Sequence, residues 1–276
     1  MASIVSISSL KGGVGKTSVT LGLASAAQAS GFRVLVVDLD PHGDASTGLG
    51  VSSQQGRDIA SLLLEPRETG IDDERVACSW VSLGSLGNAS STGLDAGVWV
   101  VRGSARSTAL ESLDSQVTLP LLSNLLVGVR DSFDLILIDC PPTLGRLTEM
   151  AWAASDRVIS VAEPSLFSVA GSERTLRAIA RFEANTEYAV NSASIVVNKV
   201  RDSDPEHDYR TEEMRTLFGD LVASTTLPDA PILQRIQGSA YPVHYWPEAE
   251  AQPLASAFTH LLQGLFPQQT LGITAE

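Results

Sequence analysis

The chain contains a series of short apolar runs that are rich in β-branched residues and are separated by segments of mixed polarity. An apolar run of strand length without polar alternation is typical of a strand buried on both faces of a parallel sheet. The runs predict strands at Ser3–Ser8, Arg33–Asp38, Gly97–Arg102, Phe133–Asp139, Arg157–Ala162, Ser194–Asn198 and Leu221–Thr226.

The segments between these runs carry helical signals. Lys16–Ser30 is rich in alanine and is followed by Gly31, a residue type that commonly ends a helix. Ala170–Phe182 and Pro253–Phe266 are also predicted to be helical. Because strands alternate with helices, the pattern predicts an α/β fold, in which a doubly wound, mostly parallel sheet is flanked by helices.

Leu110–Val129 is a further predicted helical segment, although Pro120 within it is expected to break a helix or to start one. The apolar positions near helical spacing are Leu113, Val117, Leu121 and Leu125. Ser82–Gly97 is small, polar and glycine-rich, and it predicts a mobile loop because strand-like sequence resumes beyond it. With no internal repeat and no clear boundary, we predict a single domain over residues 1–276.

Composition narrows the class of protein. Hydrophobic residues make up 43% of the chain, yet no apolar run approaches the roughly 20 residues of a membrane span. Cys78 and Cys140 are the only cysteines, so no disulfide framework is expected, and the strand-like start lacks signal-peptide features. We therefore predict a soluble cytoplasmic protein. Its net charge of −13 argues against coating nucleic acid by bulk charge.

The segment SLKGGVGKTS, from Ser9 to Ser18, predicts a phosphate-binding loop between a strand and a helix. It departs from the usual pattern, because Leu10 stands where the first glycine belongs and Lys11 stands beside it. Lys16 is predicted to neutralise the β- and γ-phosphates and Thr17 to bind Mg²⁺. The predicted phosphate-binding residues are Gly12, Gly13, Val14, Gly15, Lys16, Thr17 and Ser18.

The motif K-G-G-V-G-K-T resembles the deviant Walker A motif of the ParA/MinD group of P-loop ATPases, and the chain looks closest to the ParA/Soj branch. Three later stretches are similar to other motifs of that group, in the same order along the chain. They are LVVDLDPHGDASTGL, which resembles D-x-D-P-Q, the Walker B-like DLILIDCPPTLG, and LPDAPILQRIQGSAYPVHYW near the end of the nucleotide pocket.

The resemblance implies an ATP-dependent dimer. In this family the extra lysine, here Lys11, reaches phosphates bound by the other subunit, and the added cation offsets the charge of two sandwiched ATP molecules. The resemblance thus implies ATP and Mg²⁺ as cofactors, and a catalytic role for Lys11, Lys16 and Asp40, with Asp40 directing the attacking water. It also implies that Asp38 supports the Mg²⁺ shell and that Asp139 holds Mg²⁺ through water. Aspartates that merely cap turns are the alternative.

Asn198 ends a predicted strand, and the following residues approach the guanine-reading pattern N-K-x-D, except that the aspartate arrives one residue late. The resemblance implies that adenine is read there, by the amide of Asn198 and by backbone near Pro228. ATP is thus favoured over GTP, and a plain strand-end turn is the alternative. An iron–sulfur cluster, as in the nitrogenase iron protein, is disfavoured because Cys78 lacks that signature, and the four histidines show no ligand spacing.

Arg174, Arg177 and Arg181 fall on one face of a predicted helix and are candidates for binding DNA without sequence preference. Glu173 and Glu183 lie nearby, and the arginines that help family members bind DNA are missing after Pro228. The sequence therefore predicts a ParA-like ATPase that positions DNA or another cargo, with a ParB-like activator and nucleoid association. The alternatives are a regulatory or scaffold switch that binds a protein partner without DNA, and a metabolic enzyme of the same fold, such as an amidase. The C-terminal segment has no Lys or Arg, so membrane attachment of the MinD kind is not expected.

Overall fold

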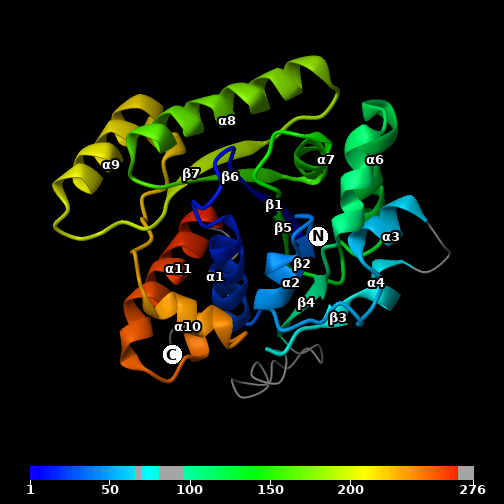
Figure 1. Cartoon of the computed structure of the whole chain (residues 1–276), viewed down its shortest axis with the longest axis horizontal. Coiled ribbons are helices and arrows are strands. Elements are labelled where there is room, and N and C mark those ends of the chain that lie inside the picture. The colour runs from blue at the N-terminus through cyan, green and yellow to red at the C-terminus, as the bar shows by residue number, and fades with distance from the viewer. Residues whose placement is uncertain (66–69, 81–95, 267–276) are drawn as a thin grey trace.

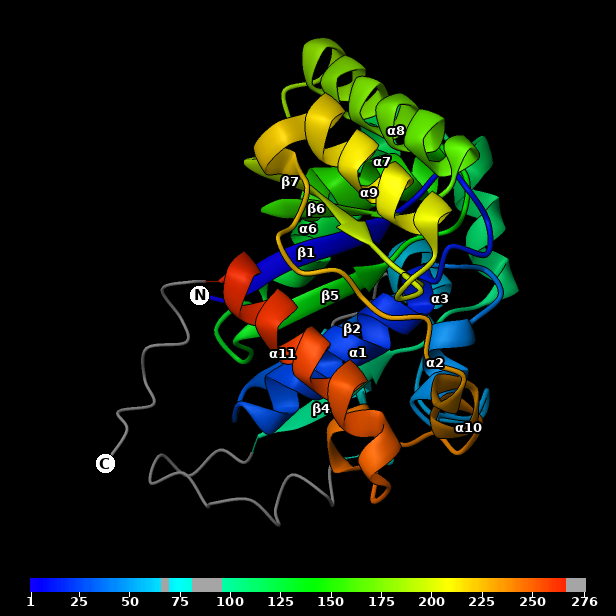
Figure 2. The ribbon, with the colours of Figure 1, turned by 90° about the vertical axis from the view of Figure 1, so that its left-hand side faces the viewer.

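The computed structural model describes residues 1–65, 70–80 and 96–266, and it forms one seven-stranded sheet with helices on both faces (Figures 1 and 2). The strands follow the order β3-β4-β2-β5-β1-β6-β7, and every pairing is parallel except that of β3 with β4. Their bounds are β1 Ser3–Ser8, β2 Arg33–Asp38, β3 Val76–Ala77, β4 Gly97–Val101, β5 Leu135–Asp139, β6 Arg157–Ala162 and β7 Ser192–Val197. The predicted doubly wound α/β fold is confirmed.

The α-helices are α1 Lys16–Ala29, α2 Asp44–Gly48, α3 Ile59–Leu64, α4 Ile71–Glu74, α6 Ser115–Val127, α7 Arg146–Ala154, α8 Leu166–Asn185, α9 Pro205–Phe218, α10 Ile232–Gly238 and α11 Gln252–Leu265. Short 3-10 helices occur at η1 Ala105–Ser112, η2 Gly219–Leu221, η3 Val243–Tyr245 and η4 Ala249–Ala251. Across the part of the chain that the structure describes, no helix is both long enough and apolar enough to cross a bilayer.

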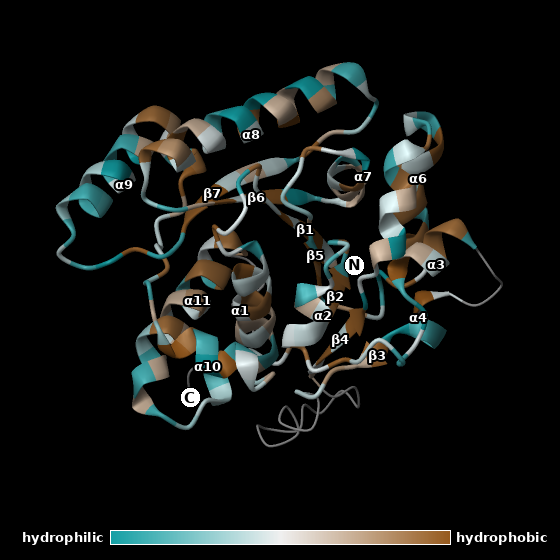
Figure 3. Cartoon of the chain, viewed as in Figure 1, coloured by the Kyte–Doolittle hydropathy of each residue, from teal (hydrophilic) through white to brown (hydrophobic). Residues whose placement is uncertain are grey.

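Alternating side chains of the central strands supply two separate cores. Leu135 and Leu137 of β5 join a cluster with α1 and α11, whereas Ile136 and Ile138 join a cluster with α6 and α7 on the other face. Figure 3 shows the hydrophobic residues along the strands and polar residues on the outward sides of α8 and α9. This two-sided burial explains why the strands read as continuous apolar runs.

One predicted strand is wrong, and one short strand of the structure was not predicted. Leu221–Thr226 is not a strand: η2 covers its first residue, and Val222 then makes one isolated bridge to Ile195. The short antiparallel strand β3 was not predicted, because two residues carry no periodic signal. The predicted mobile loop Ser82–Gly97 lies outside the described residues up to residue 95, and Gly97 begins β4.

The segment Leu110–Val129 also differs from its prediction. It holds the end of η1 and then α6, which begins after the N-cap Asp114, and Pro120 lies inside α6 instead of breaking or starting it. The helix persists because it is held by packing, in which Leu121 and Leu125 of the predicted positions take part while only partly buried. Leu119, Leu122 and Leu126 are buried, whereas Leu113 and Val117 are exposed.

Candidate nucleotide site

The phosphate-binding loop lies between β1 and α1, where a turn of glycine-rich backbone leads directly into the first helical residue, Lys16. Gly13 and Gly15 have φ values of 79° and 92°, which side chains with a Cβ rarely adopt. The N-terminus of α1 therefore opens toward the loop with free backbone N–H groups, which suits an anion. Lys16 is buried there, with 7% of its surface exposed.

Two further lysines border the loop and share one carboxylate. Lys11 Nζ lies 2.9 Å from Glu163 Oε2, and Lys199 Nζ lies 2.9 Å from Glu163 Oε1. Lys199 Nζ also donates to the carbonyl oxygen of Gly13 at 2.6 Å. Burial acts to raise the pKa of Glu163, but the hydrogen bonds from Lys11 and Lys199 outweigh it and lower that pKa. Glu163 is thus an ionised partner for both lysines.

Asp38 and Asp139 lie side by side at the carboxyl ends of β2 and β5, where they are register partners. Both side chains are fully buried. Burial raises the pKa of Asp139 to about 7, with repulsion from Asp38 adding to the effect, while hydrogen bonds from Thr17 and Thr20 oppose it. Burial likewise raises the pKa of Asp38 to about 6, and Ser46 opposes that rise. Ionising both of these neighbouring buried carboxyl groups is unfavourable, and a bound cation would offset that cost.

This donor set fits Mg²⁺. Thr17 Oγ1 donates to Asp139 Oδ2 at 2.8 Å, so the predicted magnesium residues on α1 and β5 are in contact. Asp38 Oδ2 accepts from the backbone N and the Oγ of Ser46 at 2.8 and 2.6 Å, whereas its Oδ1 is buried without a hydrogen-bond partner among the described residues. A hard cation prefers oxygen ligands of this kind. Asp38, Asp139 and Thr17 would hold it, directly or through water.

Asp40 lies beyond the end of β2, in a turn, with 7% of its surface exposed. Its Oδ1 accepts from the backbone N of His42 at 3.0 Å and lies 2.8 Å from His42 Nδ1. Because β2 stops at Asp38, Asp40 belongs to the turn and does not continue the alternation of side chains along the strand. Asp40 thus forms the turn contacts that the sequence left open as an alternative.

Asn198 and Pro228 belong to neighbouring segments beside the loop. Asn198 Nδ2 donates to the carbonyl oxygen of Val14 at 2.8 Å, so the residue is anchored to the phosphate-binding loop itself. A Cβ at Gly15 would overlap that amide. This close approach, in addition to the positive φ, explains why a glycine occupies the position. Pro228 pairs with Val200 in an isolated parallel bridge, and the structure therefore brings the two predicted base-binding segments together.

Comparison with known proteins agrees with this geometry. Residues 2–192 match the family model described as an AAA domain, which is more than half of the chain. The chromosome partitioning protein ParA of Caulobacter vibrioides is 27% identical over 228 residues, which cover 82% of this chain and 80% of that protein. The chain belongs to the ParA/MinD-type ATPase family. The P-loop ATPases of this family hydrolyse ATP.

Other similarities extend over most of the chain. An uncharacterized protein of Mycobacterium tuberculosis is 30% identical over 258 residues, covering 92% of this chain and 76% of that protein. Among solved structures, apo McdA of Cyanothece has a TM-score of 0.80 at 18% identity and covers 96% of this chain and 100% of its own.

A cobyrinic acid a,c-diamide synthase of Mycobacterium smegmatis, solved with ADP and magnesium, has a TM-score of 0.75 at 19% identity and covers 99% of this chain and 97% of its own. At this identity the likeness shows the fold alone.

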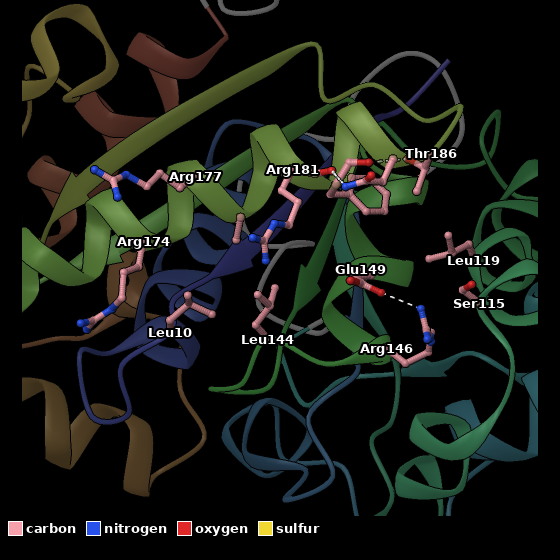
Figure 4. A pocket seen from close by; sticks show the side chains of 13 residues that line it. Leu10, Ser115, Leu119, Leu144, Arg146, Glu149, Arg174, Arg177, Arg181 and Thr186 are labelled. Carbon is pink, nitrogen blue, oxygen red and sulfur yellow. Dashed lines mark hydrogen bonds and ion pairs between the residues drawn. The ribbon is translucent and has the colours of Figure 1, made fainter.

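The arginines proposed for DNA lie on the exposed side of α8, as predicted for one helical face. Arg174, Arg177 and Arg181 line a groove of about 550 Å³ whose other wall includes Arg146 and Leu144 (Figure 4). Arg177 Nη2 donates to Glu173 Oε1, and Arg146 Nη1 donates to Glu149 Oε2, so two of the four arginines have carboxylate partners. Leu10, next to Lys11, also lines the groove, which therefore reaches the edge of the phosphate-binding loop.

The two cysteines are buried in separate core clusters, on opposite faces of the sheet. Burial raises the pKa of Cys140 to about 12. Among residues 1–65, 70–80 and 96–266, no three His, Cys, Asp or Glu side chains gather as a metal site.

Several side chains of the site were missed from the sequence. Glu163, Thr20 and Ser46 contact predicted site residues, but Glu163 and Thr20 lie outside the quoted motifs, and Ser46 lies within LVVDLDPHGDASTGL at a position that the D-x-D-P-Q pattern does not cover. Lys199 was noted only as part of the near-match to N-K-x-D. The scarcity of lysine was a signal that could have pointed to it. The chain has only three lysines, Lys11, Lys16 and Lys199, and all three lie in or beside the phosphate-binding loop.

Proposed function

We propose that this chain is a ParA-like switch in which ATP binding builds a sandwich homodimer, hydrolysis takes it apart, and the cycle positions DNA or another cargo. The observation that carries the proposal is the outer position of Lys11 in the phosphate-binding loop. Lys11 lies at the mouth of the phosphate-binding loop with 33% of its side chain exposed, and a second cation, Lys16, already occupies the interior of the same loop. A lysine in that outer position suits phosphates supplied by a second subunit.

The residues divide the work of ATP hydrolysis among them. Backbone N–H groups of the loop and Lys16 bind the β- and γ-phosphates, and Thr17, Asp38 and Asp139 hold the cation. When bound, Mg²⁺ neutralises phosphate charge that develops as the bond to the leaving ADP breaks. Asp40 orients the attacking water, which requires that its carboxylate exchange the His42 contact for water. Asn198 and backbone near Pro228 border the adenine site.

The dimer step is tested with Lys11→Ala. Light scattering with a non-hydrolysable ATP analogue should show a shift to dimer for the wild type and none for the variant. Binding of a fluorescent ATP analogue should persist in the variant, because Lys16 and the loop backbone are unchanged. An equal shift to dimer in both proteins would remove Lys11 from the interface and with it the main support for the switch.

We propose that the protein binds DNA through Arg174, Arg177 and Arg181 on α8. A ParB-like protein is the proposed activator, and the proposed location is the cytoplasm, in association with the nucleoid. The arginines are exposed on one helix, and a dimer would present two such sets. The chromosome partitioning protein ParA of Caulobacter vibrioides, one of the relatives described above, supports this proposal.

A second candidate is a nucleotide-dependent switch that binds a protein partner and no DNA. The net charge of −13 favours it, because an acidic protein repels the phosphate backbone of DNA, and the groove beside α8 has apolar lining residues such as Leu144 and Leu119 that could receive a protein side chain. Both candidates share the ATP-dependent dimer, so the binding of DNA by that dimer decides between them.

A further inference from the structure

Glu163 holds the two outer lysines of the phosphate-binding loop within one subunit. It follows the last residue of β6, its side chain is 23% exposed, and each of its carboxylate oxygens lies 2.9 Å from a different ammonium group. The hydroxyl groups of Ser165 and Ser168 lie 3.5 and 3.3 Å from Lys11 Nζ, so Glu163 and two serines form a complete polar seat for that lysine.

We propose that Glu163 is a positioning residue that retains Lys11 on its own subunit and thereby sets the ATP-dependent threshold for dimerisation. The inference rests on the proposed dimer switch. One ammonium group cannot make close contact with Glu163 and with a partner's phosphates at once, unless the phosphates lie in the same seat. Dimerisation must therefore replace the contact of Lys11 with Glu163 by a contact of Lys11 with the partner's phosphates. The free energy of the first contact reduces the net free energy that the second contributes to dimerisation.

The competition favours the phosphates only when they are present. Glu163 offers Lys11 one negative charge that it already shares with Lys199, whereas an ATP tail offers several. Without a second nucleotide the carboxylate keeps Lys11 seated, and the surface of the subunit presents a neutralised group instead of a free cation.

Lys199 links this seat to the phosphate-binding loop. It adopts a φ of 60°, in the left-handed region that non-glycine residues seldom occupy, and its Nζ contacts both Glu163 Oε1 and the Gly13 carbonyl oxygen. A movement of Gly13 as phosphates enter the loop is thus transmitted through Lys199 to the carboxylate that holds Lys11. The structure provides a direct contact route between nucleotide binding in one subunit and the release of its lysine.

The experiment measures the dimer dissociation constant by analytical ultracentrifugation with a non-hydrolysable ATP analogue. Glu163→Gln keeps the size of the side chain and removes its charge. The dimer should tighten roughly tenfold, because each of two subunits loses one partly exposed ion pair that opposed association. Glu173→Gln is the matched control, since it removes an exposed ion pair with Arg177 on α8, and it should leave the constant unchanged.

Two further arms separate retention of Lys11 from a general change of charge. Lys11→Ala alone is expected to stay monomeric, so adding Glu163→Gln to it should not restore the dimer, and the affinity of the monomer for ADP should stay within about twofold of wild type. An unchanged or weaker dimer in Glu163→Gln, or an equal gain in the Lys11→Ala background, would overturn the proposal. If wild type and Asp40→Ala both stay monomeric with ATP, the dimer switch itself is wrong, a result distinct from a wild-type dimer that Glu163→Gln leaves unaltered.

Discussion

The carboxyl groups of Asp38 and Asp139, at the ends of β2 and β5, lower the stability of the folded protein when both are ionised and no cation is bound. The pKa of Asp139 is about 7 and that of Asp38 about 6, against an ordinary value near 3.8 for each. Between those values the folded protein binds protons that the unfolded chain has released. Stability from this pair is thus fully present below about pH 4 and is lost as pH rises through 6 to 7.

The nucleotide-free protein should therefore lose stability from pH 4 to pH 8, and Asp139→Asn should reduce that loss. At pH 8 we expect the variant to be more stable than wild type by on the order of 1–3 kcal/mol, since it buries no second charge. Urea unfolding across this pH range measures the difference. With Mg²⁺ and ADP the order should reverse, because the cation favours the ionised pair.

Asp131→Asn, at an exposed position, is the control and should follow wild type at every pH. A stability of Asp139→Asn below that of wild type at pH 8 without nucleotide would show that Asp139 is ionised and satisfied in the empty site.

Asp40 is separated from this pair by its place in the turn, and its proposed role is in the rate of hydrolysis and not in binding ATP. Asp40→Ala should bind ATP and form the dimer, yet hydrolyse ATP at least tenfold more slowly, because only the group that directs water is lost. Phosphate release under single-turnover conditions, with nucleotide binding measured in parallel, tests this. Near-normal turnover would assign the Asp40 carboxylate to the turn with His42 alone.

At the scale of elements, burial explains both the success and the failure of the sequence predictions. β1, β2 and β6 match their predicted bounds because both faces of each strand are covered, which leaves a continuous apolar run. Leu221–Thr226 carries a similar composition, but its position beyond β7 gives it only one bridge. Pairing partners depend on topology, which a local pattern does not contain.

The residues of the candidate site also fall into those that a local pattern predicts and those that depend on topology. The glycines, Lys16 and Thr17 lie in one contiguous motif and were predictable, as were Asp38 and Asp139 at strand ends. Glu163 acts on residues 152 positions earlier in the chain, and nothing in its own neighbourhood marks it. Only the parallel pairing of β1 with β6 places the loop and Glu163 at the same edge of the sheet.

The packing of α1 against α11 gives a prediction for an element. A Cβ at Gly22 of α1 would overlap the ring of Phe258 on α11, which is itself buried, so Gly22→Ala should destabilise the protein by about 1–3 kcal/mol. Thermal and urea unfolding measure the change. Gly264→Ala, in α11 with no atom within 4 Å of the added carbon, is the matched control and should be neutral or slightly stabilising. Equal effects at both positions would mean that the helices adjust freely.

At the scale of the whole molecule, the distribution of charge matters more than its sum. The net charge of −13 repels DNA at long range, while Arg174 and Arg181 on α8 offer a local exception. Arg177 is already paired with Glu173, which reduces the effective charge of the stripe. A monomer with so few free arginines should bind duplex DNA weakly, and a dimer that presents two stripes gains through avidity.

The ATP dimer should therefore bind nonspecific duplex DNA, and the ADP form should not. Gel shifts at low salt with ATP, ADP or no nucleotide test this, with Asp40→Ala used to keep the dimer in its ATP state. Replacing Arg174, Arg177 and Arg181 with alanine should weaken binding at least tenfold without changing ATP affinity, and binding should fall steeply as salt rises, because phosphate contacts release counterions. The exposed Arg215→Ala on α9 is the control. If the Asp40→Ala dimer forms and does not shift DNA, the protein-partner switch becomes the better account of the groove.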